Sequence, residues 1–274
     1  MRSIEAPLTD CLEAAIAASK EAGTILQKYA HQGFHVEHKG LINLVTDADR
    51  AVEQRIIDYL TSRFSSHRFL AEERGHANEG DSPYLWIIDP LDGTTNFAHG
   101  FPVYCISIGL EYRGSCVLGV IFDPSRDELF TATHGGGAFL NGHSLQVTEI
   151  DVLDRSLLVT GFAYDIRETD DNNLNHFARF ALRAQGIRRT GSAALDLCYV
   201  AAGRFDGFWE VKLNPWDMAA GSVIVREAGG QVTNFQGQAL SVYGHNLVAS
   251  NGRIHQAMLA VLNKTEPRRP SKPQ

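Results

Sequence analysis

The hydrophobic positions in the N-terminal part of the chain predict two helices followed by a series of strands. Apolar residues at intervals of three and four predict an amphipathic helix over residues 8–30, capped by Thr9 or Asp10, and a second helix from about residue 49 onward. The short, continuous apolar run at residues 84–88 is typical of a buried strand. Two hairpins are expected next, joining strands 105–112 and 115–122 and then strands 128–133 and 137–140.

Beyond about residue 150, predicted strands alternate with predicted helices. Strands are expected at residues 157–160, 205–210 and 245–249, and helices at residues 173–185, 193–202, 216–228 and 253–263. Such alternation favours layers of helices packed on sheets. We therefore expect a mixed α+β and α/β fold of layered, alternating helices and β-sheets. It has an N-terminal α+β half at residues 1–150, a C-terminal α/β half at residues 151–263 and a disordered tail at residues 264–274.

The composition excludes several classes of protein. The chain has 274 residues, of which 44% are hydrophobic, and its formal net charge of −7 argues against a nucleic-acid-binding surface. No apolar stretch approaches the roughly 20 residues of a membrane span, and the N-terminus has no apolar signal core, so we expect a cytoplasmic protein away from the membrane. The four cysteines lack zinc or disulfide spacing, and P-loop, dinucleotide-binding and GxSxG motifs are absent.

Two aspartates follow the apolar run at residues 84–88. Asp89 and Asp92 flank a proline and a leucine, and Gly93 comes directly after them. The proline interrupts the hydrogen bonding of the strand, and a turn here would direct both carboxylates into one cavity. The N–H groups of residues 93–95 could then cradle an anion at the start of a short helix. This arrangement suits a hard divalent cation that bridges protein and phosphate. A plain turn or helix cap at Asp92 is the competing interpretation.

Two further acidic segments weaken that competing interpretation. Glu72 follows the apolar pair at residues 69–70, where a strand is expected to end. Asp217 lies in the first turn of a predicted apolar helix, where capping is its simplest role. Each segment alone favours a structural role, but the carboxylates taken together indicate a metal site. Oxygen ligands without a thiolate favour Mg²⁺ or Mn²⁺ over zinc.

These segments resemble the inositol monophosphatase family of magnesium-dependent, lithium-sensitive phosphatases. The resemblance rests on AlaGluGlu at 71–73, AspProLeuAspGlyThrThrAsnPhe at 89–97 and ProTrpAspMetAlaAlaGly at 215–221, and it extends to residues 43–49, 135–142 and 188–210. The last block is most similar to bacterial inositol-1-monophosphatases. The resemblance implies an αβαβα sandwich of the sugar-phosphatase type, with most metal ligands in the N-terminal half, and a homodimer.

The resemblance also implies a role for each matching residue. Mg²⁺ is the implied cofactor, with two to three ions bound and Mn²⁺ as a substitute. A first metal site takes Glu72, Asp89 and the carbonyl oxygen of Leu91, a second takes Asp89, Asp92 and Asp217, and Glu72 holds a weaker third ion largely through water. The implied catalytic residues are Glu72 and the pair that positions the attacking water, Asp49 and Thr94. The phosphate cradle is formed by Gly93 and Thr94, and the substrate hydroxyls are contacted by Asp92, Gly191, Ser192, Ala193 and Glu210.

Hydrolysis of myo-inositol monophosphate, a small phosphorylated polyol, is the leading hypothesis, with no covalent phosphoenzyme. The same chemistry on fructose 1,6-bisphosphate, histidinol phosphate or adenosine 3′,5′-bisphosphate is the nearest alternative. A regulatory protein that binds RNA or the transcription machinery is the alternative of another class. Arg188 and Arg189 are interpreted as a solvated pair, in preference to a contact with substrate phosphate or with a partner subunit. Lys39 lies in a loop, residues 39–43, that is one residue shorter than in some relatives.

Overall fold

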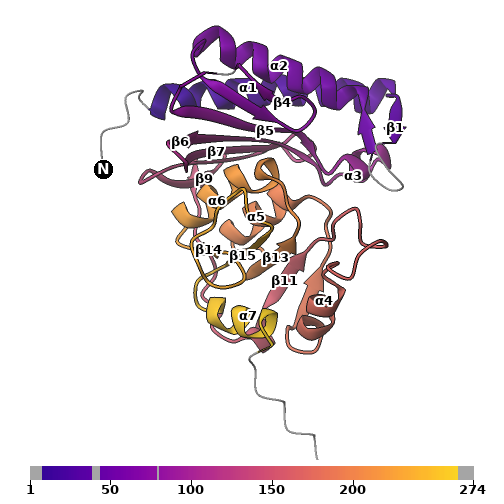
Figure 1. Ribbon diagram of the computed structural model, residues 1–274, viewed down its shortest axis with the longest axis vertical. Coiled ribbons are helices and arrows are strands. Elements are labelled where there is room, and N and C mark those ends of the chain that lie inside the picture. The colour runs from indigo at the N-terminus through magenta and orange to yellow at the C-terminus, as the bar shows by residue number, and fades with distance from the viewer. Residues whose placement is uncertain (1–7, 39–43, 79, 265–274) are drawn as a thin grey trace, which may run out of the picture.

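Five layers of helices and sheets make up the described part of the computed structural model, which covers residues 8–38, 44–78 and 80–264 (Figure 1). Helices α1 (Leu8–Gln32) and α2 (Asp47–Arg63) cover the outer face of an eight-stranded sheet. Helices α5 (Ala193–Ala201) and α6 (Pro215–Glu227) lie between that sheet and a five-stranded one. Helices α4 (Leu174–Ala181) and α7 (His255–Leu262) cover the far face of the smaller sheet. This arrangement confirms the predicted αβαβα sandwich.

The eight-stranded sheet has the order β10-β9-β8-β7-β6-β5-β3-β4, in which β3 and β5 run parallel and the other neighbours run antiparallel. Every residue of β5 and β6 is buried, because α1 and α2 pack on one face of the sheet and α6 packs on the other. Burial on both faces explains the continuous apolar run at residues 84–88. In chain order the strands are Arg68–Ala71, Gly75–Ala77, Tyr84–Asp92, Cys105–Tyr112, Ser115–Asp123, Glu128–Thr133, Gly137–Leu140 and His143–Ser144.

Helix α6 approaches the large sheet closely because two glycines face it. Gly109 of β6 pairs with Gly119 of β7, and a Cβ atom added at Gly119 would lie 2.3 Å from the carbonyl oxygen of Ala220. A Cβ atom at Gly109 would lie 2.8 Å from the Cβ atom of Ala219. The absence of side chains on these glycines therefore allows α6 to dock on the sheet. This contact determines where Asp217, two residues before Ala219, is held.

The five-stranded sheet has the order β12-β11-β13-β15-β14, with β11 parallel to both neighbours and β15 antiparallel to both of its own. In chain order these strands are β11 (Leu157–Thr160), β12 (Gly186–Arg188), β13 (Gly207–Val211), β14 (Gln231–Thr233) and β15 (Asn246–Ser250). A fully buried histidine links α7 to this sheet. His255 Nδ1 lies 2.8 Å from Ser250 Oγ and its Nε2 lies 2.9 Å from Thr233 Oγ1.

We expect His255 to make the protein less stable in mild acid. Burial lowers the pKa of His255 to about 4, whereas an unfolded histidine titrates near 6.5. Between these values the unfolded chain binds a proton that the folded chain does not. The stabilising contribution is therefore fully present above pH of about 6.5 and is lost as the pH falls to about 4, a change of roughly 3 kcal/mol. Urea unfolding of the wild type and of His255→Gln between pH of about 4 and 6.5 measures this change. The free energy of unfolding should depend less on pH in the variant. An identical pH dependence in the two proteins would refute the role of His255.

Three expectations about individual elements are wrong. Helix α1 begins at Leu8, so Thr9 and Asp10 lie inside its first turn and do not cap it. Strand β5 continues past Pro90 to Asp92 with a shift in its pairing, where a turn was expected. Helix α4 ends at Ala181, four residues early, because the N–H groups of residues 183 and 184 both bond to the carbonyl of Phe180 and close a turn.

The remaining predicted helices and strands are present, with ends that differ by a few residues. The sequence pattern missed several strands of two to four residues, among them β1 (Val36–His38) and β2 (Leu44–Thr46), which pair with each other. Strands of this length are too short to establish a periodicity.

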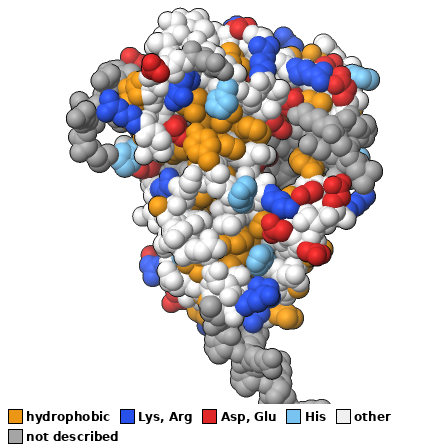
Figure 2. Space-filling model, in the orientation of Figure 1, with side chains coloured by type: hydrophobic (Ala, Val, Ile, Leu, Met, Phe, Trp, Pro, Cys, Tyr) orange, Lys and Arg blue, Asp and Glu red, His pale blue; other side chains and the backbone are white. Residues whose placement is uncertain are grey.

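The division of the chain near residue 150 stays a prediction. The two sheets fall on either side of it, yet α5 and α6 come from the C-terminal part and cover the large sheet. The loop with Lys39 and the tail beyond Lys264 lie outside the described residues. None of the helices in the described ranges has the length and apolar character needed to cross a membrane. Figure 2 shows acidic and basic side chains interspersed over one face, with hydrophobic side chains gathered near the level of the large sheet.

Candidate metal and active site

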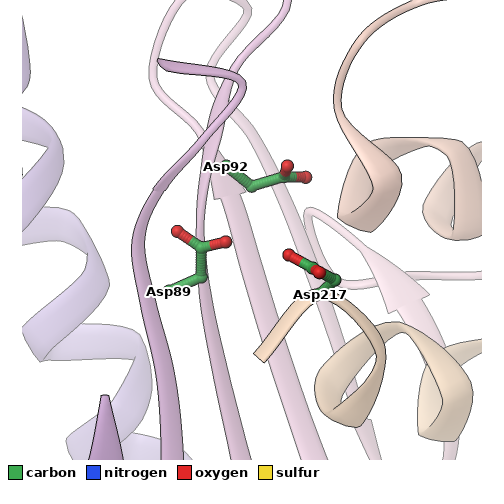
Figure 3. A group of neighbouring side chains, drawn as sticks. All are labelled: Asp89, Asp92 and Asp217. Atoms are coloured by element: carbon green, nitrogen blue, oxygen red, sulfur yellow. The ribbon is translucent and has the colours of Figure 1, made fainter. Parts of the chain in front are cut away.

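Three aspartates meet where the C-terminal end of β5 faces the N-terminal end of α6. Asp89 and Asp92 belong to β5, and Asp217 lies in the first turn of α6. Their carboxylates point toward one another (Figure 3), and one oxygen of each lies within 4.8 Å of the others. The structure thus brings together three of the predicted metal-binding residues from distant segments of the chain.

The two aspartates of β5 reach the same space because the strand is irregular between them. Residues three apart on a regular strand point to opposite faces of the sheet. Here the pairing of β5 with β6 shifts register between Asp89 and Asp92, at Pro90, which has no N–H for the ladder. The Leu91 N–H donates to Asp89 Oδ1 at 3.0 Å and fixes that carboxylate. The irregularity therefore redirects Asp92 toward Asp89.

The N-terminal end of α5 holds Asp92 from the other side. Asp92 Oδ2 accepts hydrogen bonds from the Ser192 hydroxyl at 2.6 Å and from the Ala194 N–H at 2.7 Å. Ser192 is also the N-cap of α5. The dipole of α5 and these two donors stabilise a negative charge on Asp92. Ser192, for which the sequence predicts a substrate contact, thus has a defined structural partner.

Asp217 combines the structural role and the site position that the sequence suggested as alternatives. It is the third residue of α6, and its Oδ2 accepts a hydrogen bond from the Asn214 N–H at 2.7 Å in a capping box. The same carboxylate faces Asp89 and Asp92 (Figure 3). Capping therefore fixes the carboxylate at the site.

The charges of this cluster oppose one another. Burial, followed by the charges of Glu72, Asp92 and Asp217, raises the pKa of Asp89 well above its usual range. Burial is also the largest cause of the raised pKa values of Asp92 and Asp217. Crowded, buried carboxylates are stabilised in their charged form by a cation bound among them. Carboxylate oxygens without sulfur suit a hard divalent ion, so the residues present fit a metal.

Glu72 lies beside the three aspartates and outside their tightest grouping. It directly follows β3, and its N–H donates to the carbonyl of Ile88 at 3.2 Å. This bond holds the residue next to the end of β5. Its charge contributes to the raised pKa of Asp89. The structure therefore places Glu72 close to Asp89 and supports its position at the edge of a metal site.

Asp49 and Thr94, predicted as a pair, are in hydrogen-bond contact. The Thr94 hydroxyl lies 3.3 Å from Asp49 Oδ1 and 3.0 Å from the carbonyl oxygen of Leu91. Asp49 Oδ2 in turn accepts from the N–H and hydroxyl of Thr46, the N-cap of α2. Burial is the largest cause of the raised pKa of Asp49. A hydroxyl has one proton but two lone pairs, so Thr94 can still accept a hydrogen bond from a water.

Gly93 allows a sharp change of direction between β5 and helix α3 (Thr94–Ala98). It is the N-cap of α3 and has a φ of 97°, in the left-handed region that glycine favours. A Cβ atom there would lie 2.8 Å from the carbonyl oxygen of Val103, so the position has no room for a side chain. The first N–H groups of α3 therefore open next to the carboxylate cluster, where an anion could approach them.

A pocket of about 120 Å³ adjoins the cluster and includes the other predicted residues. Asp92 and Asp217 form one end of it, and the predicted substrate contacts Gly191, Ser192, Ala193 and Glu210 form another part of the lining. Among the lining residues that the sequence analysis did not name are Tyr164 and Asp196. Arg189 is exposed, as the interpretation as a solvated residue expects, and it also lines the pocket. Asp196 offered one sequence signal, because it is a single carboxylate in the otherwise apolar helix α5.

Comparisons with known proteins agree with this geometry. A model of the inositol monophosphatase family matches residues 8–266. An inositol-1-monophosphatase from Synechocystis sp. is 47% identical over 254 residues, which is 92% of this chain and 87% of that protein. Proteins named Nus factor SuhB, one of them from Escherichia coli, are 43% identical over 91% of this chain and 94% of their own length.

A solved structure extends the likeness to three dimensions. The inositol monophosphatase from Anabaena (Nostoc) sp. superposes with a TM-score of 0.87 at 44% identity, covering 95% of this chain and 98% of that one. The family match spans all of the described residues, including both β5 and the start of α6. The chain therefore belongs to the inositol monophosphatase family and is a phosphomonoesterase.

Proposed function

We propose that the chain hydrolyses myo-inositol monophosphate to myo-inositol and phosphate in a Mg²⁺-dependent reaction. The observation that carries this proposal is the convergence of Asp89, Asp92 and Asp217 beside the open N-terminal end of α3. Glu72, Asp89 and the carbonyl oxygen of Leu91 would hold one ion, and Asp89, Asp92 and Asp217 a second. A weaker third ion would be held by Glu72. When bound, divalent ions neutralise a phosphate dianion, lower the pKa of water and stabilise a departing alkoxide.

The protein's own groups would orient the reactants. Asp49 and Thr94, in mutual contact, would position the attacking water through the free lone pairs of the Thr94 hydroxyl. The N–H groups of Gly93 and Thr94, at the start of α3, would bind phosphate oxygens. The hydroxyls of the substrate would lie against Gly191, Ser192, Ala193, Glu210 and Asp92. A water attacking in line requires no covalent intermediate on the enzyme.

A phosphate-release assay tests the proposed activity. Purified protein with Mg²⁺, with Mn²⁺ or with a chelator would be given myo-inositol 1-phosphate, fructose 1,6-bisphosphate, histidinol phosphate or adenosine 3′,5′-bisphosphate. The proposal expects the highest kcat/KM with myo-inositol 1-phosphate and Mg²⁺, and inhibition by Li⁺. A higher kcat/KM with another of these esters would identify that ester as the preferred substrate in place of myo-inositol 1-phosphate. A homodimer and a cytoplasmic location belong to the same proposal.

Bound Mg²⁺ is expected to stabilise the fold. At a concentration of about 100 times its Kd, a ligand that binds only the folded state adds about 2.7 kcal/mol. For a chain of this size that corresponds to a rise in Tm of roughly 5–10 °C. Thermal unfolding with Mg²⁺ and with a chelator measures the shift, which should shrink in Asp217→Asn. An equal shift in the wild type and the variant would mean that the ion binds elsewhere.

The relatives named Nus factor SuhB favour a second candidate, a regulatory role in binding RNA or the transcription machinery. Such a role does not depend on the carboxylate cluster. Binding of purified RNA polymerase by both the wild type and Asp89→Asn would support it. If neither protein binds RNA polymerase, phosphatase activity is the only function supported.

A further inference from the structure

Two buried carboxylates lie in the part of the active-site pocket that the metal cluster does not use. Asp196 of α5 has an exposed fraction of 1% and Glu210 of β13 one of 7%, and both line the same pocket as Asp92 and Asp217. The family resemblance accounts for Glu210 as a substrate contact. It assigns nothing to Asp196, and the mechanism proposed above does not use that residue.

Glu210 enters the pocket without a hydrogen-bond donor from the described residues. Its carboxylate lies directly against Gly161, where an added Cβ atom would be 2.2 Å from Glu210 Oε2. The missing side chain of Gly161 therefore makes the space in which this carboxylate sits. An acceptor that is more than nine-tenths buried, and that has no donor among the residues the structure describes, is stabilised by a donor from a ligand.

Asp196 has one partner and one oxygen to spare. Its Oδ1 accepts a hydrogen bond from the Thr190 hydroxyl, which leaves Oδ2 as a second acceptor. The carbonyl of Thr190 accepts from the Asn96 side chain at 2.9 Å. Asn96 lies in α3, whose first N–H groups form the proposed phosphate cradle. Asp196 is thereby fixed relative to the phosphate position.

The groups on this side of the pocket suit the alcohol end of a phosphate ester. Arg189 also lines the pocket and acts on both carboxylates, lowering the pKa values that burial raises. Two buried carboxyl groups and one guanidinium therefore make up this side of the pocket, whereas the proposed phosphate cradle lies at the start of α3. The carboxyl oxygens can accept hydrogen bonds from hydroxyl groups.

We propose that Asp196 and Glu210 together form a two-acceptor wall for the hydroxyl groups of the leaving alcohol. Asp196 is then a specificity-determining residue, and the chain selects phosphate esters of polyols over esters of alcohols that carry no further hydroxyl. The proposal rests on the phosphatase activity proposed above and specifies its substrate class. A site built to hydrogen-bond substrate hydroxyls discriminates strongly against an analogue that lacks them.

Two esters with the same six-membered carbon ring provide the test. The kcat/KM for myo-inositol 1-phosphate is compared with that for cyclohexyl phosphate, which has no hydroxyl, in the wild type and in Asp196→Asn. The substitution replaces the Oδ2 acceptor by a donor at nearly unchanged volume. The ratio of the two kcat/KM values should fall by about 10-fold in the variant, the effect of losing one buried hydrogen bond.

Asp206→Asn is the matched control. Asp206 is also a buried carboxylate that accepts from a threonine hydroxyl, Thr148 Oγ1 at 2.5 Å, but it lies outside the pocket. The ratio of the two kcat/KM values in Asp206→Asn should stay within about twofold of the wild-type ratio. A general loss of stability lowers the hydrolysis of both esters alike. A wild-type ratio near one, or an unchanged ratio in Asp196→Asn, would overturn the proposal. Hydrolysis of neither ester would instead overturn the proposed function.

Discussion

Replacing Asp89 by asparagine is expected to lower kcat/KM by at least about 10³-fold while the protein remains folded. Asp89 is the central carboxylate of the cluster and is predicted to bridge two ions, so its loss removes several kcal/mol of transition-state stabilisation. Asparagine keeps an oxygen for the Leu91 N–H, which donates to Asp89 Oδ1 at 3.0 Å. It also removes one of several charges that repel one another. The Tm of the metal-free variant should therefore equal or exceed that of the wild type.

The separation of activity from stability makes this prediction specific. Asp123→Asn is a suitable control. Asp123 is a fully buried carboxylate at the end of β7, outside the metal cluster, and its Oδ1 accepts a hydrogen bond from the Ser125 N–H at 2.8 Å. That variant should lose stability and keep its turnover within a few-fold. Retained turnover in Asp89→Asn with an unchanged metal requirement would contradict the assignment of the site.

Replacing Thr94 by valine is expected to lower kcat by about 10²-fold with little change in KM. The hydroxyl contacts both Asp49 and the Leu91 carbonyl and is the group proposed to hold the attacking water. Valine has almost the same volume but cannot accept a hydrogen bond from water, so orientation is lost and substrate binding is kept. Steady-state phosphate release measures both parameters.

Conservative and double variants test whether Asp49 and Thr94 act as a unit. Thr94→Ser keeps the hydroxyl and should retain activity within a few-fold of the wild type. Combining Thr94→Val with Asp49→Asn should cost little more than Asp49→Asn alone, because residues that act on one water are not additive. Fully additive losses in the double variant would show that the two residues act separately.

Local chemistry made much of the fold predictable from the sequence. Helices α1, α2, α5 and α6 have apolar residues at helical spacing, and the hairpin of β6 and β7 has its turn at Arg113-Gly114. The motif residues Asp89, Asp92 and Asp217 were identified because each lies at an expected end of a strand or helix. The interactions that produce these features act between neighbours in the sequence, so the pattern itself contains them.

The path of β5 through Pro90 could not be read from the sequence. A proline after a strand is compatible with a turn or with a bulge, and the choice depends on the partner strand. Strand β6 pairs with both Asp89 and Asp92, so β5 continues across the irregularity. The two aspartate side chains therefore point into the same space because the strand continues across an irregularity, and a turn is not needed.

The sequence alone therefore determined the elements, the acidic motifs and the family resemblance. The resemblance implied that Asp89, Asp92 and Asp217 bind one ion, but only the tertiary structure explains how they meet and places Asp196 in the same pocket. Asp217 reaches Asp89 because Gly109 and Gly119 allow α6 to dock on the large sheet. Asp196 enters the pocket with Glu210 because α5 packs against β13. These proximities depend on packing between segments far apart in the chain, and packing is decided by the fit of whole surfaces, which no local pattern records.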